Sequence, residues 1–504
     1  MNNNICAIID FNDFSKIKTL YGEEILFTDN SVSVAVLGNL YNREGQRLNA
    51  QAAHGLYLEY GEDVYLYFDG IFTVMIFDYA NKKAFVMQDF FGSQQAIFYY
   101  ADNEKMYITN SLRAIVTNEK RDWKMDSACV EQFILRGYSA DNKSLIEGIN
   151  MMPCTGYLFV DVANKIHCNK AYKKEPNPKR EITNEIYNEV LADQIKACLH
   201  EKMATTVSSG FDSNYILYNL NKFLDNRIDG FCIGGKTGQN EIPDAEKIAS
   251  YYGNIDLHTK QIGGSSFDML PEIIYILEGS MYERGIFLQY ELAKLVKENG
   301  VENIILGEAA DQVLNFEMYH PRHQARSILK YNSQKFLSRY LKGLHYRPYR
   351  TVYDMASYIV IKKNGIMMNY FGVNTEYPYM RKEYMKLAEN AVKIGERKKE
   401  YHKKVFSETL PKEITDIVHK MPGSTELKDL FIGDISYEAV LEFCKKSEFY
   451  TEKKFDDIYY EIDNYIKITY LETFKKMFIE EPEKYLTNTY KGYTLKELFP
   501  ELVK

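Results

Sequence analysis

The feature that most constrains the fold is a change in hydrophobic pattern near residue 172. Before it, short runs such as ICAIID and SVSVAVLGNLYNR alternate apolar and polar residues, and turn signals such as YANKK and ADNEK separate them. This period-two pattern is typical of hairpins in layered antiparallel sheets. The stretch 172–185, YKKEPNPKREITNE, is charged, carries two prolines and shows no apolar periodicity. We therefore predict a linker there, between a domain at 1–172 and a second at 186–504.

The second part is predicted to be an α/β domain with a mostly parallel sheet. MATTV, IDGFCIGG and VENIILG read as buried strands that alternate with helical segments. Beyond about residue 320 the strand signals fade, so we expect a helical C-terminal region. The first helix is predicted from apolar residues at helical spacing, namely Ile182, Ile186, Val190, Ile195 and Leu199.

Composition excludes several classes of function. The 504 residues are 45% hydrophobic, enough for two or three domain cores, and the net charge of -8 provides no positive field for nucleic acid. Seven cysteines stand singly without CxxC pairs, so we expect reduced, mostly buried thiols and no zinc site. No signal peptide and no run of ~18 apolar residues is visible. We expect a cytoplasmic protein without a membrane partner.

One strand-to-helix turn carries the first chemical signal, in TTVSSGFDSNYILYNL (205–220). In parallel sheets, ligands bind at the carboxyl ends of strands, where a helix N-terminus presents free N–H groups. Ser208, Ser209 and Gly210 let phosphate oxygens approach the backbone, and Asp212 offers a carboxylate for Mg²⁺. The alternative is an ordinary turn with a helix cap, and these residues alone do not separate the two.

A second stretch, VENIILGEAADQVL, repeats this arrangement roughly 100 residues later. An apolar strand ends in Gly307 and Glu308, and Asp311 follows before the next helix. Two carboxylates could then converge from neighbouring strand ends, which favours a nucleotide site over two unrelated turns.

Both turns resemble motifs of one family. VSSGFDS resembles the pyrophosphatase-loop motif S-G-G-x-D-S, and LGEAADQ resembles G-E-G-S-D-E, both of the asparagine synthetase family. That family includes glutamine-dependent asparagine synthetases, β-lactam and carbapenam synthetases and lasso-peptide cyclases. The segment from YGEDVYLYFDGIF to QAIFYY is similar to the core of its class II amidotransferase-type domain. The resemblance implies an Ntn-hydrolase-like αββα domain, then a parallel-sheet ATP-pyrophosphatase domain that uses ATP and Mg²⁺.

The resemblance also implies that the N-terminal domain has lost glutaminase activity. Family members use an N-terminal cysteine as nucleophile, whereas the nearest cysteine here is Cys6, inside a predicted strand. The segment Leu37–Asn42 replaces the glutamine-holding Asn-Gly-Glu-Ile-Tyr-Asn, and Asn49 replaces an aspartate. We expect a structural or substrate-binding domain, as in the β-lactam and carbapenam synthetases, which LGNLYNR and ITNSL also resemble.

For the synthetase domain, the resemblance assigns roles residue by residue. Asp212 and Asp311 are the expected Mg²⁺ ligands. The expected nucleotide contacts are Ser208, Ser209, Gly210 and Ser213 for the pyrophosphate, Gly307 in the second turn, and Val207, Ile233 and Gly234 near the adenosine.

The segment YHKKVFSETLPKEITDIVHKMPG resembles the lysine-bearing segment of the family. It places Lys399 and Lys403 near the phosphates and Lys420 at the catalytic lysine, provided that one residue is inserted after Leu410-Pro411. A solvated helix face is the alternative for this run, and we assign it to Lys398 and Lys404.

Glu308 is the informative departure. The β-lactam and carbapenam synthetases have a tyrosine there, paired with a later glutamate, whereas asparagine synthetases have glutamate. Our alignment places Lys362 where that partner would stand, so we expect Glu308 itself to orient or deprotonate the attacking amine. Gln312 replaces the last glutamate of the motif and is interpreted as a tolerated change.

These observations predict an ATP-dependent ligase that adenylates a carboxylate and closes a lactam or isopeptide bond with an amine. It would release AMP and pyrophosphate in the biosynthesis of a specialised metabolite, such as an antibiotic, or of a modified peptide. One alternative is an asparagine-synthetase-like ligase that uses free ammonia or an external amine, and another is a nucleotide-binding regulator without catalysis. The partner would be a small molecule or peptide that carries a carboxylate and an amine; homo-oligomerisation is left open.

Overall fold

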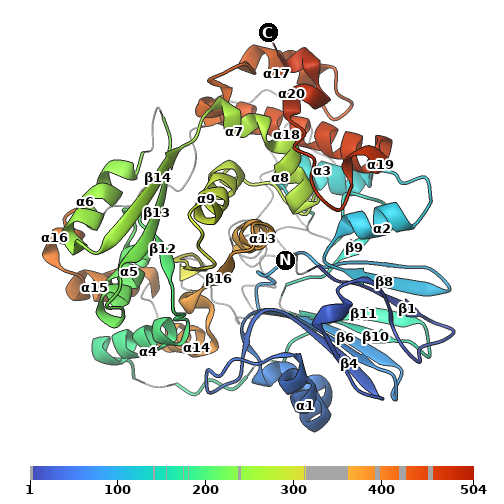
Figure 1. Ribbon diagram of the computed structural model, residues 1–504, viewed down its shortest axis with the longest axis horizontal. Coiled ribbons are helices and arrows are strands. Elements are labelled where there is room, and N and C mark those ends of the chain that lie inside the picture. The colour runs from blue at the N-terminus through green and yellow to red at the C-terminus, as the bar shows by residue number, and fades with distance from the viewer. Residues whose placement is uncertain are drawn as a thin grey trace, which may run out of the picture.

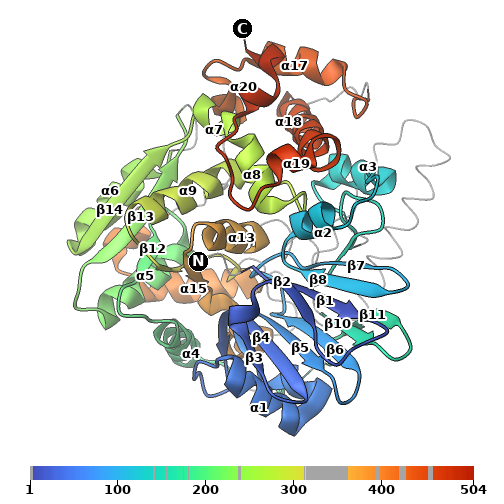
Figure 2. The same cartoon turned by 45° about the vertical axis from the view of Figure 1, so that its right-hand side comes forward.

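The structure is a computed structural model. It describes residues 4–503 except 140–141, 155, 174, 180, 237–239, 311–312, 314–360, 392–397, 419–426 and 452–457. Figures 1 and 2 show an N-terminal β-rich part, an α/β part beside it and a helical C-terminal part packed above both.

The N-terminal part contains two antiparallel sheets. Their strands are β1 (Cys6–Asp10), β2 (Lys18–Tyr21), β3 (Leu26–Thr28), β4 (Val32–Tyr41), β5 (Asp69–Asp78), β6 (Lys83–Gln88), β7 (Phe98–Ala101), β8 (Lys105–Thr109), β9 (Asn150–Met151), β10 (Gly156–Asp161) and β11 (Ile166–Ala171). The helices are η1 (Glu23–Ile25), α1 (Ala50–Tyr60), η2 (Gly61–Tyr67), α2 (Leu112–Asn118) and α3 (Ser127–Arg136).

The two sheets stack face to face, in the orders β2-β1-β8-β7-β9 and β11-β10-β6-β5-β4-β3. On β5, Met75 and Phe77 point into the core between the sheets, whereas Val74 and Ile76 pack on the opposite face with residues of α1. This alternation is the period-two pattern of the sequence. Because residues of α2 and α3 pack on the other sheet, the layers are αββα, as predicted.

The second part begins with α4 (Asn184–Ala197) and contains a five-stranded sheet. Its strands are β12 (Ala204–Thr206), β13 (Ile228–Gly234), β14 (Ile255–Gln261), β15 (Asn303–Ile305) and β16 (Asn374–Glu376). The remaining helices are α5 (Phe211–Phe223), α6 (Ile242–Tyr252), α7 (Gly264–Asp268), α8 (Leu270–Leu277), α9 (Ile286–Glu298), α13 (Lys362–Tyr370), η4 (Pro378–Met380), α14 (Lys382–Asn390), α15 (Lys398–Thr409), α16 (Lys412–Thr415), η5 (Leu427–Phe431), α17 (Tyr437–Lys445), α18 (Ile458–Lys475), η6 (Lys476–Glu480), α19 (Pro482–Tyr485), α20 (Leu495–Leu498) and η7 (Pro500–Leu502).

This sheet is parallel throughout, in the order β14-β13-β12-β15-β16. From β12 the chain first builds outward through β13 and β14, then returns to add β15 and β16 on the other side. The order therefore reverses between β12 and β15. Such a reversal opens a crevice at the carboxyl ends of the two strands, which is where ligands bind in open α/β sheets.

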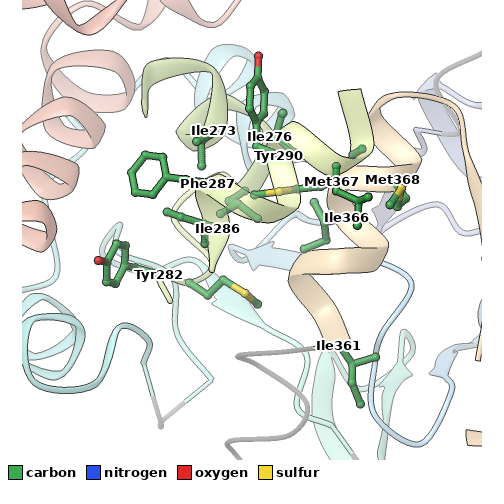
Figure 3. Packing of buried hydrophobic residues seen from close by; sticks show 14 of the residues in the cluster. Ile273, Ile276, Tyr282, Ile286, Phe287, Tyr290, Ile361, Ile366, Met367 and Met368 are labelled. Atoms are coloured by element: carbon green, nitrogen blue, oxygen red, sulfur yellow. The ribbon is translucent and has the colours of Figure 1, made fainter. Parts of the chain in front are cut away.

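Helices α8, α9 and α13 form the core beside this sheet. Figure 3 shows Ile366 and Met367 of α13 close to Ile276 of α8 and Tyr290 of α9. All four side chains are buried. This packing fixes α13, whose first residues reach the crevice.

Two local predictions were wrong. Strand β16 lies beyond residue 320, where no strand was expected. Helix α4 buries Tyr187, Leu191 and Ile195, whereas Ile186, expected on the buried face, is 37% exposed. Tyr187 is buried instead, with its hydroxyl 2.7 Å from Tyr384 Oη, whereas Ile195 is buried as expected.

Between β11 and α4 the described residues form no helix or strand, and the exact domain boundary stays a prediction. All seven cysteines are free, and five of them are buried. Across the described ranges, every helix is too short or too polar to cross a membrane.

Candidate active site

The first predicted turn lies at the carboxyl end of β12 and leads into α5. The serine hydroxyls make hydrogen bonds within the turn. Ser208 Oγ lies 2.6 Å from Ser213 Oγ and accepts a hydrogen bond from Gly210 N at 3.2 Å. Gly210 is the N-cap residue of α5 and supplies no capping side chain. Ser209 is fully buried, and its Oγ has no hydrogen-bond partner among the described residues.

The second turn touches the first. A Cβ atom on Gly307 would lie 2.9 Å from the backbone N of Ser213 and 3.2 Å from the carbonyl carbon of Asp212. Only glycine allows this approach. The turns after β12 and β15 therefore meet at the point where the strand order reverses.

Glu308 lies in this second turn with an unsatisfied oxygen. Its Oε2 is buried and has no hydrogen-bond partner among the described residues. Burial raises the pKa of Glu308, while the nearby Lys363 ammonium and a hydrogen bond with Asn364 favour its ionised form. Lys363 is in turn paired with Glu283.

The alignment that placed Lys362 opposite Glu308 is therefore wrong. The neighbours of Glu308 are the next two residues of α13, Lys363 and Asn364. Lys362 is fully buried, and burial lowers its pKa against the opposing influence of Cys154 and Asp89. Sequence spacing missed this because residues 314–360 separate the turn from α13, and spacing alone gives no register across them.

Helix α15 meets the first turn through a residue that the sequence did not single out. His402 is fully buried, and its Nε2 lies 2.7 Å from Oδ1 of Asp212. The Asp212 carbonyl oxygen accepts a hydrogen bond from Tyr379 Oη at 2.9 Å. Both the side chain and the backbone of Asp212 are thus held by elements that follow the sheet in sequence.

The predicted residues Lys399 and Lys403 belong to the same helix, three residues before and one residue after His402. Lys403 is half-buried and Lys404 is exposed, consistent with different environments. For Lys399 the structure describes the backbone only.

The residues expected near the adenosine lie just after β12 and at the end of the neighbouring strand β13. Val207 is buried, and its N–H donates to Phe231 O of β13 at 2.9 Å. Ile233 is half-buried and Gly234 buried at the end of β13. A Cβ on Gly234 would lie 2.2 Å from Oδ1 of Asn240, so the Asn240 side chain lies directly against it.

Three predicted residues lie outside the described residues: Asp311, Gln312 and Lys420. The described residues contain no group of three or more His, Cys, Asp or Glu side chains placed to hold a metal ion. Of the predicted Mg²⁺ ligands, only Asp212 can therefore be located.

The small residues and unsatisfied groups of the two turns fit a nucleotide with Mg²⁺. The Ser208–Ser213 turn sits at the N-terminus of a 13-residue helix, the buried Ser209 hydroxyl is unpaired among described residues, and Asp212 supplies a hard oxygen ligand.

A separate pocket lies at the junction of the two parts and contains none of the predicted site residues. It has about 640 Å³ of space, including its open mouth. Gln95 and Arg113 line it from one side, and Glu278, Ile366 and Tyr370 from the other.

Comparison with known proteins agrees with this architecture. Residues 49–173 match the family model described as a glutamine amidotransferase domain. Residues 187–461, more than half of the chain, match the family model described as asparagine synthase. The chain belongs to the asparagine synthase family.

Asparagine synthase relatives are distant and longer. The chain is 23% identical over 403 residues to a glutamine-hydrolysing asparagine synthetase 2 of Oryza sativa subsp. japonica, covering 73% of this chain and 59% of that one. It is 19% identical over 422 residues to the glutamine-hydrolysing asparagine synthetase B of Escherichia coli K12, covering 76% and 67%. The chain thus spans about three fifths of the length of the plant relatives it matches.

Among solved structures, this asparagine synthase family member is similar at a TM-score of 0.23 to the allosteric regulatory enzyme of purine biosynthesis, with 9% identity over 52% of this chain and 74% of that one. It reaches the same score with a U34-tRNA thiolase from Methanococcus maripaludis, with 15% identity over 50% and 85%. Scores this low do not establish a common fold.

Proposed function

We propose that this chain is an ATP-dependent ligase that forms an amide bond without hydrolysing glutamine. The observation that carries the proposal is the contact between the two turns, where Gly307 lies against Ser213 and Asp212 and positions Glu308 beside the nucleotide-binding turn. Family membership supports the ATP-dependent amide chemistry.

The chemistry divides into two steps. A substrate carboxylate oxygen attacks the α-phosphorus of ATP, and pyrophosphate leaves. An amine then attacks the acyl carbon, loses a proton and displaces AMP. Mg²⁺ held by Asp212 and Asp311 would neutralise charge on the phosphates during the first step.

The protein's own groups fit these steps. Ser208, Gly210 and Ser213, at the N-terminus of α5, would hold the departing pyrophosphate. Lys399, Lys403 and Lys420 would balance its charge and that of the acyl intermediate.

Glu308 fits the second step. Its buried Oε2 can accept a hydrogen bond from the attacking amine, and burial raises the pKa of this carboxyl group. If the attacking amine belongs to the same substrate, proximity would lower the activation barrier of ring closure by up to ~7–11 kcal/mol. A lactam or isopeptide product is therefore our specific proposal.

Several contacts support the loss of glutaminase activity. Leu37 is buried between the sheets, and Asn49 caps α1 by accepting from Ala52 N at 2.8 Å. Asn39 and Tyr41 instead bond to the second part, at Thr375 O and Glu376 Oε1. Burial raises the pKa of the Cys6 thiol to about 12, so this thiol would be inert as a nucleophile.

A second candidate function couples free ammonia or an external amine, as an asparagine-synthetase-like ligase. The observation that favours it is Glu308, the residue form that resembles asparagine synthetases. An inactive nucleotide-binding regulator is the third. A cytoplasmic location and a substrate that carries both a carboxylate and an amine stay predictions.

ATP–pyrophosphate exchange tests the first step over a panel of amino-acid, amino-acid-derived and peptide carboxylates, with aspartate included. We expect exchange with one substrate class and its loss in Asp212→Asn. The matched control is Asp225→Asn, because Asp225 is exposed just after α5. Exchange undiminished in Asp212→Asn would contradict the role of Asp212, and no exchange with any carboxylate would favour the regulator.

Glu308→Gln separates the two steps. We expect exchange to remain within a few-fold of the wild type, whereas amide product falls by roughly 10²–10⁴, the usual contribution of a positioned base. Equal loss of both would place Glu308 in adenylation instead. Ammonia release from glutamine should be absent, and its detection would refute the proposed loss of glutaminase activity.

A further inference from the structure

His402 lies at the centre of a buried hydrogen-bonded chain that ends on Asp212. Its Nε2 lies 2.7 Å from Asp212 Oδ1, and its Nδ1 lies 2.6 Å from Tyr187 Oη. Tyr384 Oη lies 2.7 Å from Tyr187 Oη and 3.2 Å from the same Nδ1. Four separate helices, α4, α5, α14 and α15, each supply one member of this chain.

One assignment of protons satisfies the whole chain. Tyr384 donates to the oxygen of Tyr187, Tyr187 donates to Nδ1 of His402, and Nε2–H of His402 donates to Asp212. In this assignment the Nε2 donor orients the Asp212 carboxylate.

Packing immobilises the imidazole. The ring of Phe406, one turn later on α15, lies 3.9 Å from that of His402, and Phe406 stacks in turn on Tyr215 of α5 at 3.9 Å. Tyr379 contacts the ring at 5.9 Å while its hydroxyl donates to the Asp212 backbone. The orientation of Asp212 is therefore set by a rigid surround.

We propose that His402 is a positioning residue that holds Asp212 in the orientation required to bind Mg²⁺ with the nucleotide, and that links α15 to the phosphate-binding turn. This inference rests on the proposed function, because it takes Asp212 as the metal ligand. Carboxylates that bind metals are commonly oriented by outer hydrogen-bond partners, and loss of such a partner lowers metal affinity 10–100-fold. The alternative is that His402 has a structural role only, as a buried side chain that fills the core.

Two substitutions at His402 separate these roles. In His402→Gln, the side-chain amide can still donate to Asp212 from about the position of Nε2. In His402→Leu, the volume is retained but no donor remains. The measurement is Mn²⁺ binding by electron paramagnetic resonance, in the presence of a non-hydrolysable ATP analogue with an α,β-methylene bridge, together with the melting temperature of each variant.

We expect His402→Leu to weaken Mn²⁺ binding 10–100-fold and His402→Gln to remain within about threefold of the wild type. The half-saturating Mg²⁺ concentration in pyrophosphate exchange should rise in parallel. If the two variants bind Mn²⁺ equally well, or if both lose binding equally while they melt at the same temperature, the positioning role is refuted.

The chain offers a matched control and a fallback. His258 Nε2 lies 3.0 Å from Asp229 Oδ1 on the neighbouring strands β14 and β13, half-exposed and outside the crevice, so His258→Leu should leave Mn²⁺ binding unchanged. If His402→Leu does not fold, the double variant Tyr187→Phe/Tyr384→Phe removes both hydroxyls that lie near Nδ1 and should weaken Mn²⁺ binding several-fold. Unchanged binding in this double variant would then refute the inference.

The readouts also separate failure of this inference from failure of the proposed function. Wild-type protein that binds Mn²⁺ and nucleotide but shows no exchange would refute the ligase and still test His402. Wild-type protein that binds no Mn²⁺ with nucleotide would refute both. Normal exchange, with Mn²⁺ binding indifferent to His402, would refute the positioning role alone.

Discussion

At the scale of single residues, Ala309 shows how the second turn departs from the motif it resembles. Its φ is +76°, in the left-handed region, where the motif G-E-G-S-D-E has glycine. An L-residue there is strained by about 1–2 kcal/mol. Local sequence patterns could not reveal the strain, because alanine, unlike glycine, does not mark a left-handed position.

We predict that Ala309→Gly leaves the free energy of unfolding unchanged or raises it by up to about 1 kcal/mol, since relief of strain offsets the greater entropy of unfolded glycine. Ala53→Gly, at a buried position of α1, should instead lose about 1 kcal/mol or more. Urea denaturation of both variants measures the contrast. Equal losses would mean that residue 309 is not strained.

Asp89 is a buried acid whose titration lies in an accessible range. Its carboxylate accepts hydrogen bonds from Phe91 N and Ser93 N at 3.0 Å, yet burial raises its pKa to about 6. The unfolded chain gives up this proton near pH 4. The folded state therefore binds more protons between pH 4 and 6, so this contribution to stability is full below about pH 4 and is lost as pH rises through 6.

We predict that wild type loses about 2–3 kcal/mol relative to Asp89→Asn between pH 4 and pH 7. Urea denaturation can be followed by fluorescence of the single tryptophan, Trp123, which is buried in the N-terminal part. Asp225→Asn, at an exposed position, should show no such pH dependence. A difference between wild type and Asp89→Asn that is constant with pH would contradict the raised pKa.

At the scale of elements, the sequence predicted what local periodicity encodes. The longer strands of the N-terminal sheets, together with β12, β13 and β15, were recognisable because their apolar runs repeat at every second residue or form short buried stretches. The short strands β2, β3 and β9 were not predicted. Strand β16 was not, because it has three residues, Asn-Thr-Glu, whose burial comes from pairing with β15 and from contacts with the N-terminal part.

For the candidate site too, the sequence predicted only what local patterns encode. Both turns follow local strand-to-helix patterns, so the sequence singled out Asp212 and Glu308 as candidates. His402 stands in a lysine-rich run that is typical of a solvated helix face, and no local pattern marks its burial. Lys363 and Asn364 depend on the register across residues 314–360, which spacing alone cannot supply.

The meeting of the two turns gives a prediction at this scale. Gly307→Ala would place a methyl group 2.9 Å from a backbone nitrogen of α5, so the β15 turn must move. We expect a loss of about 1–3 kcal/mol in stability, typical of overpacking, and at least tenfold weaker binding of a fluorescent ATP analogue.

Gly55→Ala is the matched control for Gly307→Ala. Gly55 lies within α1, where an added Cβ has no neighbour within 4 Å, so alanine should raise stability by about 0.5–1 kcal/mol. Nucleotide binding equal to wild type in Gly307→Ala would mean that the contact between the turns does not shape the site.

At the scale of the whole molecule, buried polar contacts join the two parts. Arg381 Nε lies 2.9 Å from Asp69 Oδ2, with side chains 2% and 11% exposed, and its guanidinium lies 4.3 Å above the Tyr41 ring. Tyr41 Oη lies 2.6 Å from Glu376 Oε1, which also contacts His200 at 3.3 Å. Pairs more than 300 residues apart leave no trace in local patterns, so the sequence predicted two parts but not how they join.

At this junction the segment Leu37–Asn42 contacts β16, and together they join the N-terminal part to the parallel sheet. The sequence resemblance aligns this segment with residues that hold glutamine in glutaminases, and in the structure Asn39 donates to Thr375 O on β16, the strand beside β15. The N-terminal part thereby buttresses the sheet edge next to the second turn. A domain without glutaminase activity would still be required for a stable synthetase part.

Arg381→Met tests that dependence. It leaves Asp69 buried without its partner, which typically costs about 3–5 kcal/mol. Because the pair spans the junction, we expect the two parts to unfold separately, with Trp123 fluorescence and far-UV circular dichroism giving different midpoints in urea. Arg227→Met breaks a similar Arg–Asp pair with Asp256, whose side chains are 60% and 45% exposed, and should cost less than about 1 kcal/mol. Coincident midpoints and a small loss in Arg381→Met would show that the N-terminal part does not buttress the sheet through this pair.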